Sequence, residues 1–355
     1  MEPLPVHSAE EWPYVLTLLP EDLEESARET EALVRCRNVP DAAALLRMAL
    51  AYAVSDLSLK DVAAWASALE VASITGPGLF YRLREAERWL ERVLAQTLEQ
   101  GVANRPAGLR LRIVDATVIN GPGALGTQWR AHLLVSPMTG RFQAVQLTDA
   151  TGGEGYARHP IEAGDVVLGD RAYATARGLH AVRSRGAHVV ARLNPHTLRM
   201  CDARHRRISL IPKARQVPKV GAMDFDIIIP VPPEKRSKSH KPWRLDQAVA
   251  WQPARVTAGR TRKGEVIWVL STLAPEDFPP LFILNLYRLR WQVELLLKRL
   301  KSLLHLDALP SRQGPTAKSW MLARLLAAAL AQHLVEPSGA LSPWGYELRE
   351  TRLHP

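Results

Sequence analysis

The stretch "NRPAGLRLRIVDATVI", residues 104–119, marks the point where the chain changes from helical to strand-like patterning. From Leu109 to Asp115 the side chains alternate with a period of two, which is typical of a strand. Two more strand-like segments follow, "WRAHLLVS" and "RFQAVQLTDA", each after a turn rich in glycine or proline. Three strands in series, joined by short turns, predict an antiparallel meander.

After the meander the pattern alternates between strands and helices. "DVVLGD" (165–170) and "AHVVARLN" (187–194) are short apolar strands, and "YATARGLHAVRSRG" between them is typical of a helix. Two further strands, "FDIIIPV" and "EVIWVLSTL", precede a long helix at 281–306 and a last helix at 317–335. This order predicts an α+β or α/β fold, a mixed sheet with flanking helices.

The chain is long enough for two or three domains. We expect a helical N-terminal domain (1–105), a catalytic domain in two parts (106–198 and 281–355), and a basic β-rich insertion between them (199–280). Within residues 41–100, a helix with a Ser58–Asp61 capping box is followed by a break and a longer helix. This pattern is compatible with a helix-turn-helix in which Tyr81, Arg82 and Arg84 face DNA, or with an ordinary helical bundle.

Positive charge is concentrated in one segment. The net charge is +10, and residues 199–263 hold sixteen Lys and Arg against five Asp and Glu. Residues 1–34, in contrast, hold nine acids and one arginine. The basic segment favours a polyanionic partner, nucleic acid before a membrane surface, although a solvated basic loop would have the same composition.

Several other classes of protein are disfavoured. Two cysteines, Cys36 and Cys201, predict neither a disulfide framework nor a zinc cluster, as expected of a reducing cytosol. The N-terminus lacks the basic and apolar regions of a signal peptide, and the longest apolar run is too short to cross a bilayer. We therefore expect a cytoplasmic protein without membrane partners.

The stretch "YRLRWQVELLLKRLK", residues 287–301, carries an unusual polar stripe. On a helix at about 100° per residue, Tyr287, Arg290, Glu294 and Lys301 fall within about 60° of arc, roughly opposite a row of leucines. A solvated face would explain the polarity. It explains less well why a tyrosine and the only acid between Asp277 and Asp307 share the stripe.

Two aspartates stand at strand positions where carboxylates are uncommon. Asp115 lies within the first strand, and Asp170 ends the "VVLGD" strand, at the edge where open α/β sheets bind ligands. Taken singly, Asp115 could be a strand-end cap and Asp170 a turn former. If Asp115, Asp170 and Glu294 converge, they could hold two Mg²⁺ ions about 3.5–4 Å apart, the arrangement of a phosphoryl-transfer site.

The spacing Y-x2-R-x3-E-x6-K, formed by Tyr287, Arg290, Glu294 and Lys301, resembles the Y-R-E-K signature of a large group of bacterial insertion-sequence DDE transposases. "VDAT" followed by "WRAHLLVS" resembles the region of that group's first aspartate, and "VLGDRAYA" resembles the region of its second. The resemblance covers residues 107–309, and more weakly 41–100. It implies an RNase H-like catalytic domain that cuts transposon ends and joins them to target DNA.

The resemblance also implies roles for single residues. Asp115, Asp170 and Glu294 would bind Mg²⁺, with Mn²⁺ as a substitute, and Tyr287, Arg290 and Lys301 would contact the DNA backbone. Trp268 stands where relatives have a tryptophan that stacks on a flipped base; packing in a strand is the alternative, and Trp243 and Trp251 fit this role less well. The partners implied are transposon terminal inverted repeats, target DNA and a second copy of the chain in the DNA complex. On charge, Arg204, Arg206 and Arg207 in the insertion are further DNA-contact candidates.

Two alternatives remain open at this point. The chain could be a transposase-derived DNA-binding protein that no longer cuts, which the three intact acidic positions disfavour. It could also be another RNase H-like nuclease, which the Y-R-E-K helix and the basic insertion disfavour.

Overall fold

The computed structural model describes residues 12–55, 57–100, 109–121, 123–234, 243–261, 263–291, 293–294, 297–298, 309 and 314–335. The chain forms two compact units. We call residues 1–104 with 303–355 the helical unit, and residues 105–302 the sheet unit. No helix among the described residues is long and apolar enough to span a membrane.

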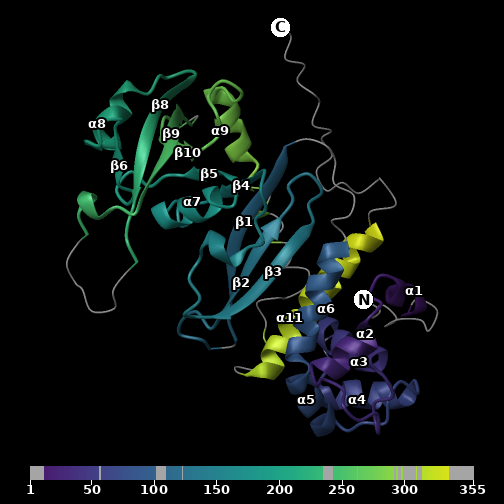
Figure 1. Cartoon of the computed structure of the whole chain (residues 1–355). Coiled ribbons are helices and arrows are strands. Elements are labelled where there is room, and N and C mark those ends of the chain that lie inside the picture. Colours follow the sequence, from purple (N-terminus) through teal and green to yellow (C-terminus); the bar gives the residue numbers. More distant parts are fainter. Residues whose placement is uncertain are drawn as a thin grey trace. The chain divides into compact units, whose positions relative to one another are not determined.

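The described residues of the sheet unit contain a ten-stranded sheet in the order β3-β2-β1-β4-β5-β10-β9-β8-β6-β7 (Figure 1). Its strands are β1 (Arg110–Ile119), β2 (Trp129–Val135), β3 (Phe142–Asp149), β4 (Asp165–Gly169), β5 (His188–Arg192), β6 (Met200–Cys201), β7 (Arg207–Ile208), β8 (Ala222–Val231), β9 (Ala250–Arg260) and β10 (Val266–Ser271).

The first three strands form the predicted meander, and two more strands extend it into a mixed sheet. β1, β2 and β3 pair in series as an antiparallel meander. β4 pairs with β1, and β5 with β4, both in parallel. A meander continued by two parallel strands on the other side of β1 is the mixed sheet of an RNase H-like domain, so the predicted fold class is confirmed.

The basic insertion is continuous with this sheet. β10 pairs antiparallel with β5, and β9 and β8 follow it in the same sheet. The insertion is rich in strands, as expected, but the expectation that it forms a separate element is wrong, because its strands belong to the same sheet. The insertion extends the edge that β5 would otherwise expose, and pairing that edge removes a row of unsatisfied backbone groups.

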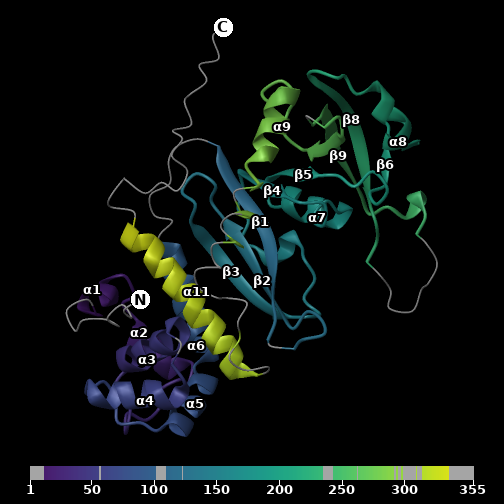
Figure 2. The ribbon, with the colours of Figure 1, turned by 180° about the vertical axis from the view of Figure 1, so that it is seen from behind.

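Helices lie on both faces of the sheet (Figures 1 and 2). The helical elements of the sheet unit are η1 (Tyr156–Arg158), α7 (Ala176–Arg183), α8 (Leu210–Lys213), η2 (Ala214–Gln216), η3 (Leu245–Gln247) and α9 (Pro280–Arg288). Leu179 and Val182 of α7 share a buried cluster with Val256 and Ala258 of β9. α9 lies on the other face, because a Cβ added to Gly259 would meet Leu284 of α9 at 2.6 Å.

The helical unit consists of α1 (Trp12–Thr17), α2 (Leu23–Glu29), α3 (Ala42–Val54), α4 (Leu59–Ala68), α5 (Gly76–Glu85), α6 (Glu87–Gln100) and α11 (Pro315–Val335). The predicted capping box opens α4, where the Ser58 hydroxyl accepts from the Asp61 N–H and the Asp61 carboxylate accepts from the Ser58 N–H. In α5, Tyr81 is exposed with Arg84 over its ring, whereas Arg82 donates to the Arg35 carbonyl. A DNA-contacting role for this region remains an expectation.

The last helix, α11, packs in the helical unit rather than in the catalytic domain where we expected it. It runs alongside α6 and also contacts α3 and α5 (Figures 1 and 2). Its Leu- and Ala-rich sequence is buried on nearly all sides, so it requires several neighbours to cover it. Lys318 adds ion pairs to Glu87 and Glu91 at 2.8 and 3.3 Å.

Part of the acidic N-terminal segment has a structural role. Arg92 of α6 binds Asp22 at 2.7 Å and also pairs with Glu29, and Gln96 donates to Asp22. Glu24 accepts from the backbone N–H of Ala42 near the start of α3. These contacts connect the acidic residues to α3 and α6 within the helical unit.

Candidate active site

Parallel pairing of β1 with β4 brings the two predicted aspartates together. The pairing runs from Arg110 opposite Asp165 to Ile113 opposite Leu168. Two residues further along, the same offset sets Asp115 beside Asp170. The local sequence favours this arrangement, since "RIVDAT" and "VVLGD" are strands whose ladder hydrogen bonds fix which residues lie side by side.

Asp115 is a largely buried carboxylate with few compensating contacts. Its side chain is only 14% exposed and accepts hydrogen bonds from the Ala116 N–H at 2.8 Å and from Arg290 at 3.2 Å. Burial, with smaller contributions from the charges of Asp170 and Glu154, raises its pKa to about 6 against the opposing effects of these two contacts. Raised pKa values are common where carboxylates are gathered for chemistry.

Asp170 follows directly after β4. Its carboxylate accepts from the Ala172 N–H at 2.8 Å, which orders the turn behind the strand. Its negative charge acts on Asp115, Glu154 and Tyr287, since it raises the pKa of each. Asp170 is therefore close enough to these three side chains to act on them electrostatically.

The helix that carries the polar stripe is interrupted, which corrects the prediction of one long helix over 281–306. α9 ends at Arg288, Leu289 and Arg290 form a turn, and the described residues from Trp291 to Lys298 are helical again. The backbone hydrogen bonds tighten to an i→i+3 pattern there, with the Arg290 N–H donating to the Tyr287 carbonyl at 3.0 Å. The prediction that Tyr287 and Glu294 lie within one narrow arc assumed an unbroken helix, so it does not apply across this turn.

Arg290 nevertheless joins the two sides of the site. Its guanidinium donates to Asp115 at 3.2 Å and to the carboxylate of Glu294. Glu294 is 53% exposed, whereas Arg290 is 16% exposed. Two of the three predicted metal ligands are therefore held in this structure by one arginine cation.

The other residues of the stripe have different positions. Tyr287 is half-buried on α9; burial raises the pKa of its phenol, while the nearby charge of Arg290 and a hydrogen bond from that side chain lower it. Lys301 lies outside the described residues.

The three predicted ligands, Asp115, Asp170 and Glu294, are of the right chemical type for a hard divalent cation, but in this structure Glu294 is bonded to Arg290. Carboxylate oxygens are the ligands that Mg²⁺ and Mn²⁺ prefer. Burial is the main cause of the raised pKa of Asp115, and the charges of Asp170 and Glu154 add to it, so a cation beside this carboxylate would offset both effects. Within the described part of the chain, however, no three His, Cys, Asp or Glu side chains form a ready metal site. Glu294 would have to exchange Arg290 for a metal ion to complete one.

Sequence reasoning missed two charged residues at this edge. Glu154, in the loop after β3, interacts electrostatically with Asp170 and Asp115. Arg192, at the end of β5, acts on Tyr287 and lowers its pKa. Arg192 could have been predicted as a site residue, because it ends a strand adjacent to β4. Glu154 could not, because its loop has no periodic pattern that indicates where a side chain lies.

The three predicted DNA-contact arginines of the insertion belong to the hairpin formed by β6 and β7: Arg204 and Arg206 in its turn, and Arg207 at the start of β7. Arg204, Arg206 and Arg207 are all exposed. Asp202 organises the turn by accepting from the Arg204 N–H and by pairing with the Arg206 guanidinium at 2.8 Å. Arg204 and Arg207 are therefore better placed for a phosphate contact than Arg206, whose charge is already paired.

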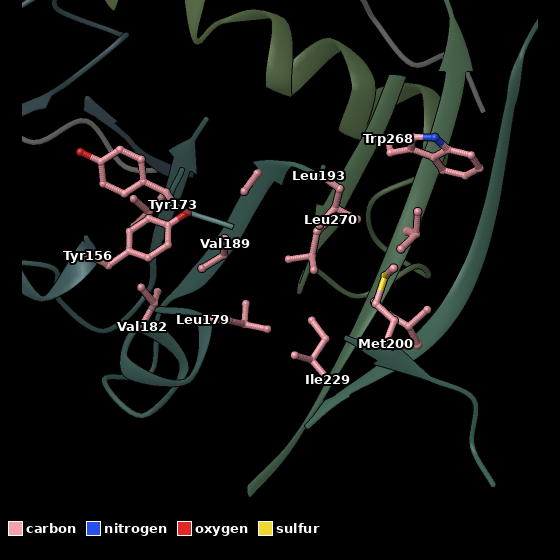
Figure 3. Close-up of a cluster of buried hydrophobic side chains, with 14 of the residues drawn as sticks. Tyr156, Tyr173, Leu179, Val182, Val189, Leu193, Met200, Ile229, Trp268 and Leu270 are labelled. Atoms are coloured by element: carbon pink, nitrogen blue, oxygen red, sulfur yellow. The ribbon is translucent and has the colours of Figure 1, made fainter. Parts of the chain in front are cut away.

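Trp268 lies in the core of the sheet unit, which corrects the expectation that it contacts DNA. Its side chain is 5% exposed and belongs to a buried cluster with Met200 and Leu270 (Figure 3). A stacked base could reach this indole only if the cluster opened. The packing alternative therefore describes Trp268. Trp243 is partly buried against Arg199, whose guanidinium lies 4.4 Å from the ring centre.

Comparison with known proteins assigns the chain to a family of transposases. Residues 106–330 match the family described as "Transposase DDE domain". The chain is 33% identical to InsL of Escherichia coli strain K12, the protein assigned as transposase of insertion sequence element IS186A, over 94% of this chain and 96% of that one. It is also 33% identical, with the same coverage, to the Escherichia coli transposase for insertion sequence element IS421. A solved structure, a cryo-EM piggyBac transposase synaptic complex with hairpin DNA, has a TM-score of 0.42 at 8% identity, covering 92% of this chain and 80% of that one.

The family match covers both aspartates, the insertion and the helix with Glu294. Membership implies chemistry that depends on a divalent metal ion and confirms the resemblance on which the sequence analysis relied. The chain belongs to the transposase DDE-domain family and is an insertion-sequence transposase, a DNA-cleaving and strand-transferring enzyme.

Proposed function

We propose that this transposase cuts the ends of its element and joins them to target DNA by two-metal phosphoryl transfer, with Asp115, Asp170 and Glu294 as the metal-binding side chains. The observation that carries the proposal is the parallel pairing of β1 with β4, whose register, continued two residues beyond Ile113 and Leu168, supports a pair of neighbouring carboxylates at one edge of the sheet. The contact of Arg290 with both Asp115 and Glu294 supports a third carboxylate near the same edge.

Bound divalent ions would activate the attacking water or 3′ hydroxyl and stabilise the departing oxygen. Mg²⁺ suits three carboxylates because it prefers oxygen ligands, and Mn²⁺ would substitute for it. The protein would fix the geometry, since Asp115 lies within β1 and Asp170 directly follows β4, where its carboxylate accepts from the Ala172 N–H. Glu294 would complete the set from the helix side once it is released from Arg290.

The basic side chains around the site would hold the DNA. Arg290, freed from the two carboxylates, would contact a phosphate next to the scissile bond, together with Tyr287 and Lys301. A guanidinium suits this role because it forms paired hydrogen bonds with phosphate oxygens. Arg204 and Arg207 would contact the backbone further away, and Arg206 would do so more weakly.

We propose terminal inverted repeats and target DNA in the bacterial cytoplasm as the substrates. A second copy of the chain would join in the DNA complex, because two ends have to be brought together before they are joined to one target.

The test uses purified full-length protein, a labelled duplex carrying the terminal repeat that flanks the gene, a target plasmid and Mg²⁺. The wild-type protein should nick the duplex at the repeat and join it to the plasmid, and Asp170→Asn should do neither while still binding the duplex. Binding without cutting by the wild type would identify a silent descendant. Cutting without joining would identify a nuclease of another kind.

A further inference from the structure

A row of charged side chains crosses three adjacent strands at the active-site edge of the sheet. β5 pairs with β4 in parallel, and the last pair is Gly169 with Ala191. One residue further along this register, Arg192 lies opposite Asp170. The register between β1 and β4, continued two residues beyond its last pair, sets Asp115 opposite Asp170 on the other side. Because β1, β4 and β5 are neighbours in the sheet, two acids and one arginine stand at one level.

Asp115 and Arg192 point to the face of the sheet on which α9 lies. Successive side chains along a strand point to opposite faces. Val114, next to Asp115, belongs to the buried cluster on the face that α7 covers. Ala191, next to Arg192, belongs to the same cluster. The acid and the arginine therefore point to the other face, where α9 contacts β5.

Arg192 is a cation whose donors the protein leaves open. The residue is half-buried, and among the described residues its guanidinium makes no hydrogen bond and no ion pair. Its charge reaches Tyr287 of α9, since it lowers the pKa of that phenol. Arg290, in contrast, is bonded to both Asp115 and Glu294. Arg192 is therefore a positive charge at this edge that can bind an anion without first releasing a carboxylate.

Another arginine on the same sheet shows what a structural role requires. Arg255, on β9 two strands away from β5, is 2% exposed. Its guanidinium pairs with Asp224 at 2.9 Å and donates to the Phe278 carbonyl. Partners of this kind offset the cost of taking a cation out of water. Arg192 has no such partner in the described part of the chain, so its donors are available to an acceptor that the chain does not supply.

A DNA phosphate is the acceptor that this position fits. A guanidinium donates paired hydrogen bonds to phosphate oxygens and keeps its charge over the whole working pH range. Groups that stabilise charge on a reacting phosphate act best when they are fixed before the reaction. β5 is paired on both sides, by β4 and by β10, and Arg192 itself lies opposite Val269 of β10. The sheet therefore fixes the backbone of this arginine beside the two aspartates.

We propose that Arg192 binds a phosphate of the transposon end beside the Asp170 carboxylate, as a further DNA-contacting residue of the active site. This assignment rests on the proposed function and extends it. Arg290 has to leave two carboxylates before it can contact DNA, whereas Arg192 contacts it at once. Arg192 would thus hold the phosphate on the strand side of the site while the helix side rearranges.

The first test measures binding of a terminal-repeat duplex to full-length protein without metal, so that no cleavage occurs. Fluorescence anisotropy at several salt concentrations gives the affinity and the log–log salt slope. Arg192→Gln should weaken binding by about 10- to 100-fold, as expected for the loss of a hydrogen-bonded charge. The slope should decrease by about 0.9, the contribution of one neutralised phosphate. An unchanged slope would overturn the proposal.

The matched control is Arg185→Gln. Arg185 is exposed in the turn before β5, at the opposite end of the strand from Arg192, and donates to the His159 carbonyl. It lies away from the carboxyl edge of the sheet, so this variant should keep the wild-type slope. An equal decrease in both variants would mean that any lost arginine lowers the slope, which would contradict a specific contact.

A conservative variant separates the phosphate contact from packing and remains informative if the glutamine variant does not fold. Arg192→Lys keeps the charge but cannot form paired hydrogen bonds. Its salt slope should therefore equal that of the wild type, while its affinity should lie below that of the wild type and above that of a folded Arg192→Gln. A lowered slope in Arg192→Lys would show that charge is not what this position contributes, and the proposal would fail.

Neutral phosphates identify the contact directly. A methylphosphonate placed at single positions around the cleavage site removes one DNA charge at a time. One position should weaken binding by the wild type and make no difference to Arg192→Gln, because the partner of that phosphate is already gone. If every position that matters to the wild type matters equally to Arg192→Gln, this arginine does not touch the DNA.

An Asp170→Asn background separates a DNA contact from simple compensation of the acidic charge. Arg192→Gln should weaken duplex binding as much in this background as in the wild type. Loss of the effect would show that Arg192 serves only to offset Asp170. Failure of the proposed function is distinguishable: a wild type that binds through Arg192 but cuts nothing in Mg²⁺ would refute catalysis alone, whereas normal cutting with an unchanged Arg192→Gln slope would refute this contact alone.

Discussion

The strand side and the helix side of the active site are constructed differently. Asp115 and Asp170 each lie two residues beyond the last pair of the parallel ladder between β1 and β4, Ile113 with Leu168. Glu294 lies beyond an interruption in its helix, is half exposed, and reaches the site through Arg290. The strand side is therefore preformed by the fold, whereas the helix side is held by a cation that the protein itself supplies.

This difference indicates which interactions are easily exchanged. An ion pair with one exposed partner contributes at most about 1 kcal/mol, so releasing Glu294 from Arg290 costs little. Asp115 lies within β1 with its side chain only 14% exposed, so its position is set by the sheet. We infer that arriving metal and DNA complete the site by repositioning Glu294 and Arg290 around a fixed pair of aspartates.

The largest expected effect comes from the strand side. Asp115→Asn and Asp170→Asn should each lower single-turnover cleavage of a transposon-end duplex by about 10³-fold or more, because a two-metal site without one of its ligands no longer stabilises both oxygens. The double variant should be little worse than either single one, as expected for residues that act as a unit. Asp277→Asn, in the exposed turn before α9, is the matched control and should cleave normally. Additive effects in the double variant would argue against a shared site.

The next effect concerns Trp268 and the core that supports the strand side. Trp268→Ala should lower the free energy of unfolding by about 3–5 kcal/mol, because it leaves a cavity in the cluster of Figure 3. Urea unfolding followed by circular dichroism measures the decrease, which should be smaller for Trp268→Phe. A stable Trp268→Ala protein that nicks DNA but fails at hairpin formation would revive the base-stacking role.

The buried charge of Asp115 predicts a dependence of stability on pH. Its pKa rises from 3.8 unfolded to about 6 folded, so the folded state binds the proton more tightly. This group therefore favours folding fully below about pH 4, and that contribution disappears as the pH rises to about 6. The cost of the ionised form is on the order of 3 kcal/mol.

The measurement is metal-free urea unfolding of the wild type and Asp115→Asn between pH 4 and pH 7. The variant should become the more stable of the two as pH rises, and saturating Mg²⁺ should reduce the difference because the cation offsets the charge. A difference that stays constant across this range would show that Asp115 is not the source of the pH dependence.

The smallest expected effects are the changes in DNA binding on replacing basic residues of the insertion. Replacing Arg204, Arg206, Arg207 and Lys213 together should weaken DNA binding and flatten its dependence on salt, by about 0.9 in the log–log slope for each phosphate that the protein no longer neutralises. Among single variants, Arg204→Ala and Arg207→Ala should change the slope more than Arg206→Ala, whose guanidinium is paired with Asp202. Fluorescence anisotropy at several salt concentrations gives the slopes. An unchanged slope in the fourfold variant would make the insertion a structural extension of the sheet only.

The contrast between the two sides also explains what the sequence could predict. The strands before Asp115 and Asp170 could be predicted from a period-two segment and a short apolar run, but their parallel register, which fixes every neighbour, could not. The interruption at Leu289 and Arg290 could not be predicted, because leucine and arginine are good helix formers and the contact of Arg290 with Asp115 is tertiary.

Three other differences between the prediction and the structure also depend on tertiary contacts. α11 has the composition of a buried helix, and composition does not say which neighbours bury it. Trp268 fits a strand and a base-stacking site equally well until its cluster is known. Glu154 lies in a glycine-rich loop, where no periodicity indicates the direction of a side chain.

The central claim is that Glu294, despite its exposure and its bond to Arg290, joins the two aspartates in catalysis. The direct measurement is single-turnover cleavage of a labelled transposon-end duplex in Mg²⁺ by Glu294→Gln, with the exposed Glu276→Gln as matched control. Glutamine keeps the volume and nearly the helix propensity of glutamate, so fold and DNA binding should persist. We predict that cleavage and strand transfer by Glu294→Gln fall by orders of magnitude while Glu276→Gln stays normal. Near-normal cleavage by Glu294→Gln would remove this helix from the active site and leave its polar stripe as a solvated face.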